Sequence, residues 1–475
     1  MTRFLIFVIT LSLNLALTGQ EYNIKPVMEL KIADKLGQLR AVPVQAGENH
    51  PHAIAIMYSE EYEVDPWEGM FFFPKHTLKV MVITVEGEVL WKKDLGEGVV
   101  PGIWFSPLFA FDLNQNGYDD LWIINNRDHE HPLNYRHYVL ERLNVETGEL
   151  LDEIPWPHPE VPQTLSALYR HFIMGGYVRG EPVLLTAQGT YGPMRIQAWN
   201  SDLTRRWEHY IPADAPGALG SHVTPVVDLN GDGVDALFWG ERLIELDTGQ
   251  QLFCADEDTW QGHSDIIQPV YDYDNNKWYF FTCRESHDRQ APRVALYDSR
   301  GDRVWGDLDR GHIDTGWAAR LGDNGEPYVL GVKVGQKIRT AEGETRTEVT
   351  EFTYKAFCGE PVEFGFDLYT TIPVDLNGNG IHELVKGYFE GTGDIIDRHG
   401  NIIGNIGGLS AMACKFTSME GEQILSYSRD GWIRIWADLN ARDNQRAINR
   451  YNNPFYRINR IQTGNGYNLF NLGGI

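Results

Sequence analysis

Cysteine is scarce in this chain, which has only four in 475 residues: Cys254, Cys283, Cys358 and Cys414. Four cysteines allow three pairings, and their spacing selects none of them, so a disulfide scaffold is excluded and the fold must depend on its core. Long apolar runs are also lacking, because no segment after residue 20 is long and apolar enough to span a bilayer. No amphipathic helical pattern of ordinary length is present either.

Positive charge is the other deficit. Lys and Arg total 41 against 66 Asp and Glu, which gives a net charge of −25, and the acidic residues are spread along the chain. Nucleic acid is therefore disfavoured as a partner, because its binding requires a basic surface. An acidic polysaccharide is disfavoured for the same long-range reason, unless Arg and His gather in a cleft.

What is abundant favours short strands. The chain has 48 Gly, 14 Trp and 12% aromatic residues, a mixture typical of many strands joined by tight turns and unlike that of a disordered chain.

The first residues predict a secretory signal peptide. Arg3 is followed by an apolar stretch from Phe4 to Leu17 and then by small residues, and cleavage after Gly19 is expected. No cysteine lies near this point, which argues against a lipid anchor. We therefore expect residues 1–19 to be removed and the protein to be secreted or periplasmic, with no membrane span and as a monomer.

An acidic turn recurs along the chain. Strong copies occupy residues 112–120, 228–235 and 375–383, weaker ones residues 272–277 and 321–326, and each lies between two apolar runs. Glycine-containing hairpin turns fall between them, at Gly87, Gly148, Gly249, Gly301, Gly400 and Gly431. From Asp228 the acidic turn repeats at roughly 44 to 55 residues, which is the length of a four-stranded blade. The sequence thus predicts an all-β propeller over residues 20–475, eight-bladed in preference to seven-bladed, with an aromatic C-terminal tail that closes it.

The acidic turns carry the oxygen ligands that Ca²⁺ requires, at alternating positions with a glycine for the sharp bend. The candidate calcium ligands are Asp112, Asn114, Asn116, Asp120, Asp228, Asn230, Asp232, Asp375, Asn377, Asn379 and Glu383. The alternative is that these side chains bond only to their own backbone.

Several histidines precede predicted innermost strands, where a propeller would bring them together around its channel. They are His171, His222, His263 and His312. The alternative for each of these histidines is a structural role, as a buried and hydrogen-bonded residue between neighbouring blades. Cys283 and His287, with His263 and His312, form a candidate site for Zn²⁺ or another divalent metal. A long loop offers further binding groups, namely Arg127, His129, His131 and Tyr135, and a strand end offers Tyr191 and Arg195.

The chain resembles the family 11 rhamnogalacturonan lyases, best from about residue 217 onward. The similarity is carried by the acidic turns and by residues 261–265, 284–285, 297–305, 314–319, 453–457 and 466–468. The resemblance implies an eight-bladed, calcium-binding propeller that cleaves the rhamnose–galacturonate backbone of pectin by β-elimination. The chain departs from the family in having Cys283-Arg284-Glu285 where members have His-Glu, and it lacks room for their extra N-terminal β-domain.

The expected function is therefore a lyase acting on a rhamnose–uronate polysaccharide, either rhamnogalacturonan or a polymer such as ulvan. Elimination requires neutralisation of the uronate carboxylate, a base and an acid. Arg195 or Arg127 is the candidate for the first role, and His171, His222 and Tyr191 are candidates for the other two. A glycoside hydrolase using Asp265 and Asp314 remains open, as does a non-catalytic propeller that binds a glycan or a protein.

Overall fold

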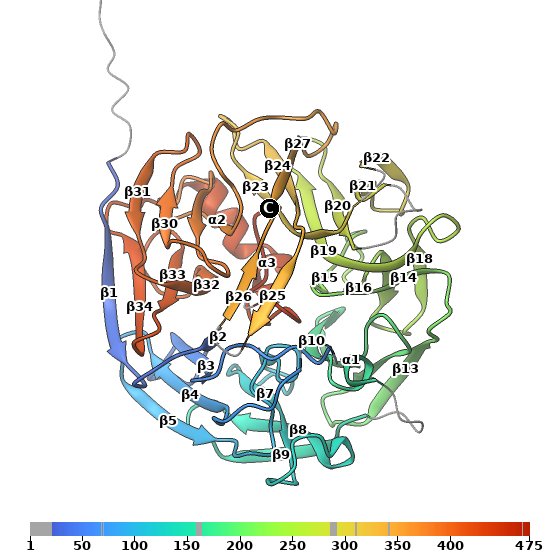
Figure 1. Ribbon diagram of the computed structural model, residues 1–475, viewed down its shortest axis with the longest axis vertical. Coiled ribbons are helices and arrows are strands. Elements are labelled where there is room, and N and C mark those ends of the chain that lie inside the picture. The colour runs from blue at the N-terminus through green and yellow to red at the C-terminus, as the bar shows by residue number, and fades with distance from the viewer. Residues whose placement is uncertain are drawn as a thin grey trace, which may run out of the picture.

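The computed structural model describes residues 21–475 except 68, 70, 158–163, 286–291, 309–310, 341–342 and 468. The predicted signal peptide and His287 lie outside the described residues. Eight antiparallel sheets are arranged around a central axis, as Figure 1 shows. The prediction of an eight-bladed β-propeller is confirmed. No helix in the described ranges has the length and apolar character needed to cross a membrane.

Each blade runs from the hub outward. Blade 1 consists of β2 (Gln38–Val44), β3 (Ala53–Ser59), β4 (Lys79–Thr84) and β5 (Val89–Asp94), and blade 2 of β6 (Leu108–Phe111), β7 (Asp120–Asn126), β8 (Tyr138–Asn144) and β9 (Leu150–Pro155). Blade 3 consists of β10 (His171–Val178), β11 (Glu181–Gln188), β12 (Met194–Trp199) and β13 (Arg205–Ile211). Blade 4 consists of β15 (Val226–Val227), β16 (Ala236–Trp239), β17 (Arg242–Glu245) and β18 (Gln251–Cys254).

Blades 5 to 8 follow the same pattern with additions. Blade 5 consists of β19 (Gln261–Asp272), β20 (Lys277–Arg284), β21 (Val294–Asp298) and β22 (Arg303–Asp307), with β14 (Gly217–Ser221) added parallel to β19. Blade 6 consists of β23 (Ile313–Arg320), β24 (Pro327–Lys333) and β27 (Thr350–Lys355), and blade 7 of β28 (Thr371–Val374), β29 (Glu383–Lys386), β30 (Asp394–Ile396) and β31 (Ile402–Asn405). Blade 8 consists of β32 (Leu409–Cys414), β33 (Gln423–Tyr427), β34 (Trp432–Asp438) and β1 (Ile24–Lys31). A separate hairpin, β25 (Lys337–Thr340) and β26 (Gly343–Arg346), projects across the centre of the ring in Figure 1.

The ring is closed by the N-terminal strand. β1 pairs antiparallel with β34 over nearly its whole length, from Ile24 opposite Asp438 to Lys31 opposite Trp432. The first and second strands of the blades are buried, whereas the outer strands β5, β9 and β22 are largely exposed. Burial of the inner strands between neighbouring blades provides the hydrophobic core that fixes the position of the hub.

The two ends of the ring differ. At one end of the ring, the first strand of each blade begins and the second strand finishes; we call this the strand-start end. The turns between first and second strands lie at the other, the turn end, and these include all three strong acidic turns. The acidic turns and the residues that precede the first strands are therefore separated by the length of an inner strand.

The C-terminal tail fills the channel instead of closing the ring. Helices α2 (Gln445–Asn452) and α3 (Pro454–Asn459) lie at the turn end, and Arg442 and Asn444 bond there to the backbone of the acidic turn at 375–383. The chain then runs through the hub, where Thr463 bonds to Leu108 and Asn465 to the carbonyl of His222 at the strand-start end, and it returns to bond with Tyr271 at the turn end. The tip of this excursion, at residues 465–467, lies below the strand-start mouth of the channel.

Gly466 at the tip has no room for a side chain. Its φ is +94°, and a Cβ atom would lie 2.2 Å from the Trp104 ring. We expect Gly466→Ala to lower the free energy of unfolding by about 2–4 kcal/mol, from backbone strain together with overpacking. Thermal denaturation measures the loss. Gly180→Ala is the control, because Gly180 has a φ of +89° with nothing within 4 Å of the added atom. An equal loss in both variants would contradict tight packing of the tip.

The other short elements are α1 (Leu165–Leu168) and a 3-10 turn over Tyr135–His137. The four cysteines form no disulfide bond, and Cys283 and Cys414 are buried in the core.

Candidate functional site

Ionisable side chains from blades 3 to 6 meet at the strand-start mouth. This hub cluster comprises Tyr191, His222, His263, Asp265, Glu285, His312, Asp314 and Lys337. They come from the loop after β11, the segment before β15, the start of β19, the end of β20, the start of β23 and the start of β25. Propeller geometry therefore brings together groups that are widely separated in sequence.

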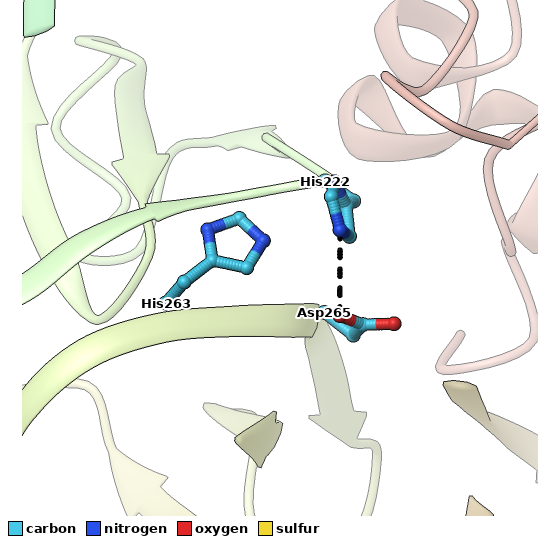
Figure 2. Close-up of side chains that lie close together, drawn as sticks. All are labelled: His222, His263 and Asp265. Carbon is cyan, nitrogen blue, oxygen red and sulfur yellow. Dashed lines mark ion pairs between the residues drawn. The ribbon is translucent and has the colours of Figure 1, made fainter. Parts of the chain in front are cut away.

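The first half of the cluster is His222, His263 and Asp265, shown in Figure 2. All three are buried, the imidazole centroids are 4.3 Å apart, and His222 Nε2 lies 3.4 Å from Asp265 Oδ1. Among the described residues, three buried atoms of this half make no hydrogen bond: His222 Nδ1, His263 Nε2 and Asp265 Oδ1. Buried polar atoms are normally satisfied, so unsatisfied atoms on three adjacent side chains indicate a ligand.

The tautomer of His263 supports a metal ligand at this point. The Thr190 hydroxyl donates to the Leu219 carbonyl at 3.2 Å and lies 2.7 Å from His263 Nδ1. With the hydroxyl proton on the Leu219 carbonyl, Nδ1–H donates to the hydroxyl and His263 Nε2 carries a free lone pair, so these contacts permit a metal-binding tautomer. One ligand atom from each of His222, His263 and Asp265 can lie within 4.8 Å of the others. Two imidazoles and a carboxylate suit Zn²⁺ and related divalent ions, so these residues fit a metal.

The second half of the cluster is Glu285, His312 and Asp314. His312 bridges the two carboxylates, with Nε2 3.2 Å from Glu285 and Nδ1 3.3 Å from Asp314. The Lys337 ammonium, at the start of the projecting hairpin, pairs with Asp314, and the Tyr191 hydroxyl donates to Glu285 Oε2 at 2.6 Å. Glu285 and Asp314 therefore each have a protein donor or cation beside them, although both Asp314 oxygens, like Asp265 Oδ1, make no hydrogen bond among the described residues.

Burial sets the protonation of the first half. It lowers the pKa of His222 to about 4 and that of His263 well below its usual value, so both imidazoles are neutral at neutral pH. Burial, and then the Glu285 carboxylate, raises the pKa of Asp265 well above 3.8. A bound cation would relieve this unfavourable negative charge.

Different causes act in the second half. Burial opposes ionisation of His312, but the Glu285 and Asp314 carboxylates outweigh it and raise its pKa. Burial and Glu285 raise the pKa of Tyr191 well above 10, so its phenol stays protonated. The Tyr191 ring is 37% exposed while its hydroxyl bonds inside the cluster, and the His312 side chain is 35% exposed. Tyr191, His312 and Lys337, whose side chain is 22% exposed, are accordingly the groups of the cluster that a polymer in the mouth can reach.

The walls of the site hold these groups in place. Arg170 pairs with Asp65 at 3.1 Å, and its guanidinium lies 4.0 Å from the Trp104 ring centroid and 5.2 Å from that of Tyr191. On the floor, the Tyr467 hydroxyl from the tail tip donates to Asp265 Oδ2 at 2.8 Å.

Of the predicted catalytic residues, His222 and Tyr191 lie in the hub cluster. The ring nitrogens of His171 instead lie 2.7 and 2.9 Å from the carbonyl oxygens of Phe105 and Leu168, within the core. Arg127 and Arg195 pair with glutamates of the outermost strands β9 and β13. The predicted substrate-binding residues His129, His131 and Tyr135 lie in the loop that follows β7 at the strand-start end.

The predicted soft-metal set is divided by the fold. His263 belongs to the first half of the cluster and His312 to the second. Cys283 is fully buried in β20 with its sulfur facing the Leu330 carbonyl at 3.9 Å, and it belongs to neither candidate metal group among the described residues.

The acidic turns bind their own backbone and differ in burial. In each strong copy the leading aspartate, Asp112, Asp228 or Asp375, accepts from amides four and five residues later. The copies led by Asp112 and Asp228 are largely exposed, whereas Asp375, Asn377 and Glu383 are buried, with Asn379 beside them. Of the predicted ligands in these two copies, Asn114, Asn116, Asn230 and Asp232 are exposed, whereas Asp120 is buried and pairs with Arg142 at 2.6 Å.

Sequence reasoning missed the site roles of Glu285, Lys337, Arg170 and Tyr467. Asp265 and Asp314, by contrast, carry a sequence signal, because Gly-His-x-Asp occurs at both 262–265 and 311–314, at the start of two consecutive inner strands. Residues two apart on a strand share a face, so each His-x-Asp pair points its side chains to the same side. Lys337 and Tyr467 lie in segments outside the repeat and carry no such signal.

No protein-family model matches this sequence. Rhamnogalacturonan exolyase YesX of Bacillus subtilis (strain 168) is 26% identical over 304 residues, which are 54% of this chain and 48% of YesX, so the chain spans about half the length of that relative. The crystal structure of the exotype lyase YesX superposes with a TM-score of 0.71 at 16% identity, covering 94% of this chain and 82% of that one.

Two further structures show the same fold. Rhamnogalacturonan lyase YesW has a TM-score of 0.71 at 15% identity, covering 95% of this chain and 81% of that one. The Bacillus licheniformis rhamnogalacturonan lyase PL11 has a TM-score of 0.68 at 16% identity, covering 96% and 82%. In sequence and in fold, this chain resembles the family 11 rhamnogalacturonan lyases.

Proposed function

We propose that this protein is a polysaccharide lyase that cleaves a rhamnose–uronate polymer, rhamnogalacturonan or a relative such as ulvan, by β-elimination at the hub cluster. The observation that carries the proposal is the double contact of Glu285, whose carboxylate accepts from the Tyr191 hydroxyl at 2.6 Å and lies 3.2 Å from His312 Nε2. One buried carboxylate thereby positions a protonated phenol and an imidazole side by side at an accessible mouth. These are an acid and a base suited to elimination near neutral pH.

The roles follow from charge and access. Lys337 is the partly exposed cation of the cluster and attracts the uronate carboxylate, which makes its α-proton more acidic. The buried Arg170, behind the Tyr191 ring, adds positive potential without direct contact. His312 accepts that proton, the bond from C4 to the glycosidic oxygen breaks as the C4–C5 double bond forms, and Tyr191 protonates the leaving oxygen. A divalent metal held by His222, His263 and Asp265 would supply further positive charge for the carboxylate.

The activity test uses rhamnogalacturonan and ulvan with purified protein. A lyase raises the ultraviolet absorbance of the unsaturated uronate, a hydrolase releases reducing ends without that absorbance, and a non-catalytic propeller does neither. Either of the last two results on both polymers would overturn the proposal.

Export is part of the proposal, because a polysaccharide of this kind is an extracellular polymer. We propose cleavage after Gly19 and a secreted or periplasmic monomer. N-terminal sequencing and fractionation of the expressing cell test the first point, and light scattering tests the second. A mature protein that begins at Met1 would contradict export.

Calcium is proposed at the buried acidic turn. Burial, and then Glu422, raises the pKa of Asp375 to about 7, and burial with Asp375 raises that of Glu383 well above 4.5. The Tyr22 hydroxyl donates to Glu383 Oε1 at 2.8 Å. A cation between the two carboxylates would relieve their repulsion.

We therefore expect saturating Ca²⁺ to raise the melting temperature by about 5 °C, and chelation to reverse this, because a ligand that binds only the folded state stabilises it. Asp375→Asn should abolish the increase, as measured by differential scanning fluorimetry. Asp397→Asn, in the hairpin turn at 397–401, should retain it. An increase that survives Asp375→Asn would place the calcium elsewhere.

A further inference from the structure

A groove opens at the turn end, on the opposite side of the molecule from the hub cluster. Its volume is about 960 Å³, and it is formed by the turns of blades 5 and 6, the end of β27 and helix α2. The residues that matter in its lining are Tyr273, Asn275, Arg320, Arg446, Asn449 and Arg450. None of these belongs to the hub cluster or to a strong acidic turn.

Arg320 is a buried cation without an acidic partner. Its side chain is 8% exposed and forms no ion pair with any described residue. It donates through Nη1 to the Gly325 carbonyl at 2.9 Å and through Nη2 to the carbonyls of Tyr271 at 2.6 Å and Gly474 at 3.2 Å, whereas its Nε makes no hydrogen bond in the described part of the chain. Burial lowers the pKa of Arg320 to about 10, and Arg450 and Arg446 act in the same direction. Guanidinium groups are rarely buried unless paired, which indicates a missing anion.

The neighbouring arginines add positive charge. Arg450 is paired with Glu422 at 3.2 Å, but Arg446 is exposed on α2 and forms no ion pair within the described ranges. In a chain with a net charge of −25, Arg320 and Arg446 thus place at one groove two guanidinium groups that form no ion pair within the described ranges.

Most acidic side chains of the lining already form hydrogen bonds or ion pairs with protein groups. Asp272 accepts from the amides of Asp274 and Asn275, Asp323 pairs with Arg398 at 2.6 Å, and Glu326 accepts from Asn324. Asp274 is exposed at the edge of the groove. The lining holds four acidic and four basic residues, and among the basic ones Arg320 and Arg446 form no ion pair within the described residues and are left for an incoming anion.

Aromatic and amide groups complete a surface suited to sugars. Tyr273 is 45% exposed, and the Arg320 guanidinium lies 4.6 Å from its ring centroid, which holds the ring in place. Asn275 and Asn449 are exposed amides on either side. Tyrosine rings provide rigid, amphipathic contact area, and asparagine provides adaptable hydrogen bonds.

We propose that this groove is a second, non-catalytic site that binds an acidic oligosaccharide, with a uronate carboxylate at Arg320 and Arg446 and a sugar ring on Tyr273. The choice of a uronate-containing ligand rests on the proposed function. The groove and the hub cluster lie at opposite ends of the channel, so the site holds polymer to the enzyme without competing with the cleavage site.

The test is isothermal titration calorimetry with purified oligogalacturonates on the full chain carrying Tyr191→Phe, which prevents cleavage. The expected result is two binding events per chain, with one of them weakened about tenfold by Arg446→Gln, because a charge-assisted hydrogen bond is lost. Tyr273→Ala should weaken the same event. That event should also weaken with added salt and be absent with carboxyl-reduced oligosaccharide.

The matched control is Arg442→Gln. Arg442 is exposed near the same helix but pairs with Glu420 at 3.1 Å and does not line the groove. Equal binding by Arg446→Gln and the Arg442→Gln control, or equal binding of the carboxyl-reduced sugar, would overturn the inference. Failure of the proposed function is distinguishable, since a protein without lyase activity on any polymer would still lose one binding event with Arg446→Gln.

Discussion

Replacing Tyr191 by phenylalanine is expected to lower kcat on the cleaved polymer by about 10²- to 10⁴-fold, the usual contribution of a general acid, with little change in KM. Only the hydroxyl is removed, so the ring keeps its contacts with His263, 4.2 Å away between centroids, and with Arg170. The pKa of Tyr191 is raised well above 10, so the phenol stays protonated at mildly alkaline pH. We therefore expect that any fall in activity of the parent protein in that pH range comes from another group. Initial rates of absorbance increase across a pH series measure both effects.

The control for this substitution is Tyr210→Phe. Tyr210 is 54% exposed on β13, the strand of blade 3 farthest from the hub, and the Tyr210→Phe variant should keep full activity. A Tyr191→Phe protein with parental kcat would remove Tyr191 from the reaction. The leaving oxygen would then have to be protonated by another group of the cluster.

Asp265→Asn should weaken binding of a divalent metal at the hub cluster by at least about 100-fold, because it removes the only carboxylate from the candidate ligand set. The asparagine carbonyl can still accept from Tyr467, so the tail tip keeps its anchor. In metal-free protein the melting temperature should not fall, since burial makes the charged form of Asp265 unfavourable. Titration calorimetry with Zn²⁺, Mn²⁺ and Ca²⁺, and the metal content after dialysis, measure the affinity.

Asp438→Asn is the matched control, because Asp438 is equally buried and bonds only to backbone amides at the end of β34. It should leave metal binding unchanged. If Asp265→Asn bound metal as tightly as the parent, the unsatisfied atoms of His222, His263 and Asp265 would need another explanation.

The repeat made the fold predictable, because each blade carries its own local turn chemistry. Glycines such as Gly249 and Gly301, with φ of +74° and +84°, occupy positions that the backbone conformation reserves for glycine, so they mark hairpins from sequence alone. Ring closure by β1 could not be inferred in the same way. Strand 24–31 pairs with a partner about 400 residues away, and no short-range pattern encodes that pairing.

The site was predictable only where it follows the repeat. His222, His263 and His312 occupy equivalent positions before or within inner strands, so the blade period placed them at one mouth. Arg127, after β7, and Arg195, on β12, instead pair with glutamates of the outermost strands β9 and β13, and the sequence pattern does not show which partner an arginine will take. Lys337 and Tyr467 reach the cluster from an inserted hairpin and from the tail, which tertiary packing alone positions.

The pairing of β1 with β34 has a consequence for biogenesis. A ribosome completes β1 hundreds of residues before its partner exists, so seven blades can assemble while the eighth has only its outermost strand and still lacks β32, β33 and β34. Long-range pairing of this kind slows folding and leaves strand edges exposed in the meantime. The last tens of residues, which supply both β34 and the segment that fills the channel, therefore convert an open arc of sheets into a sealed ring in a single late event.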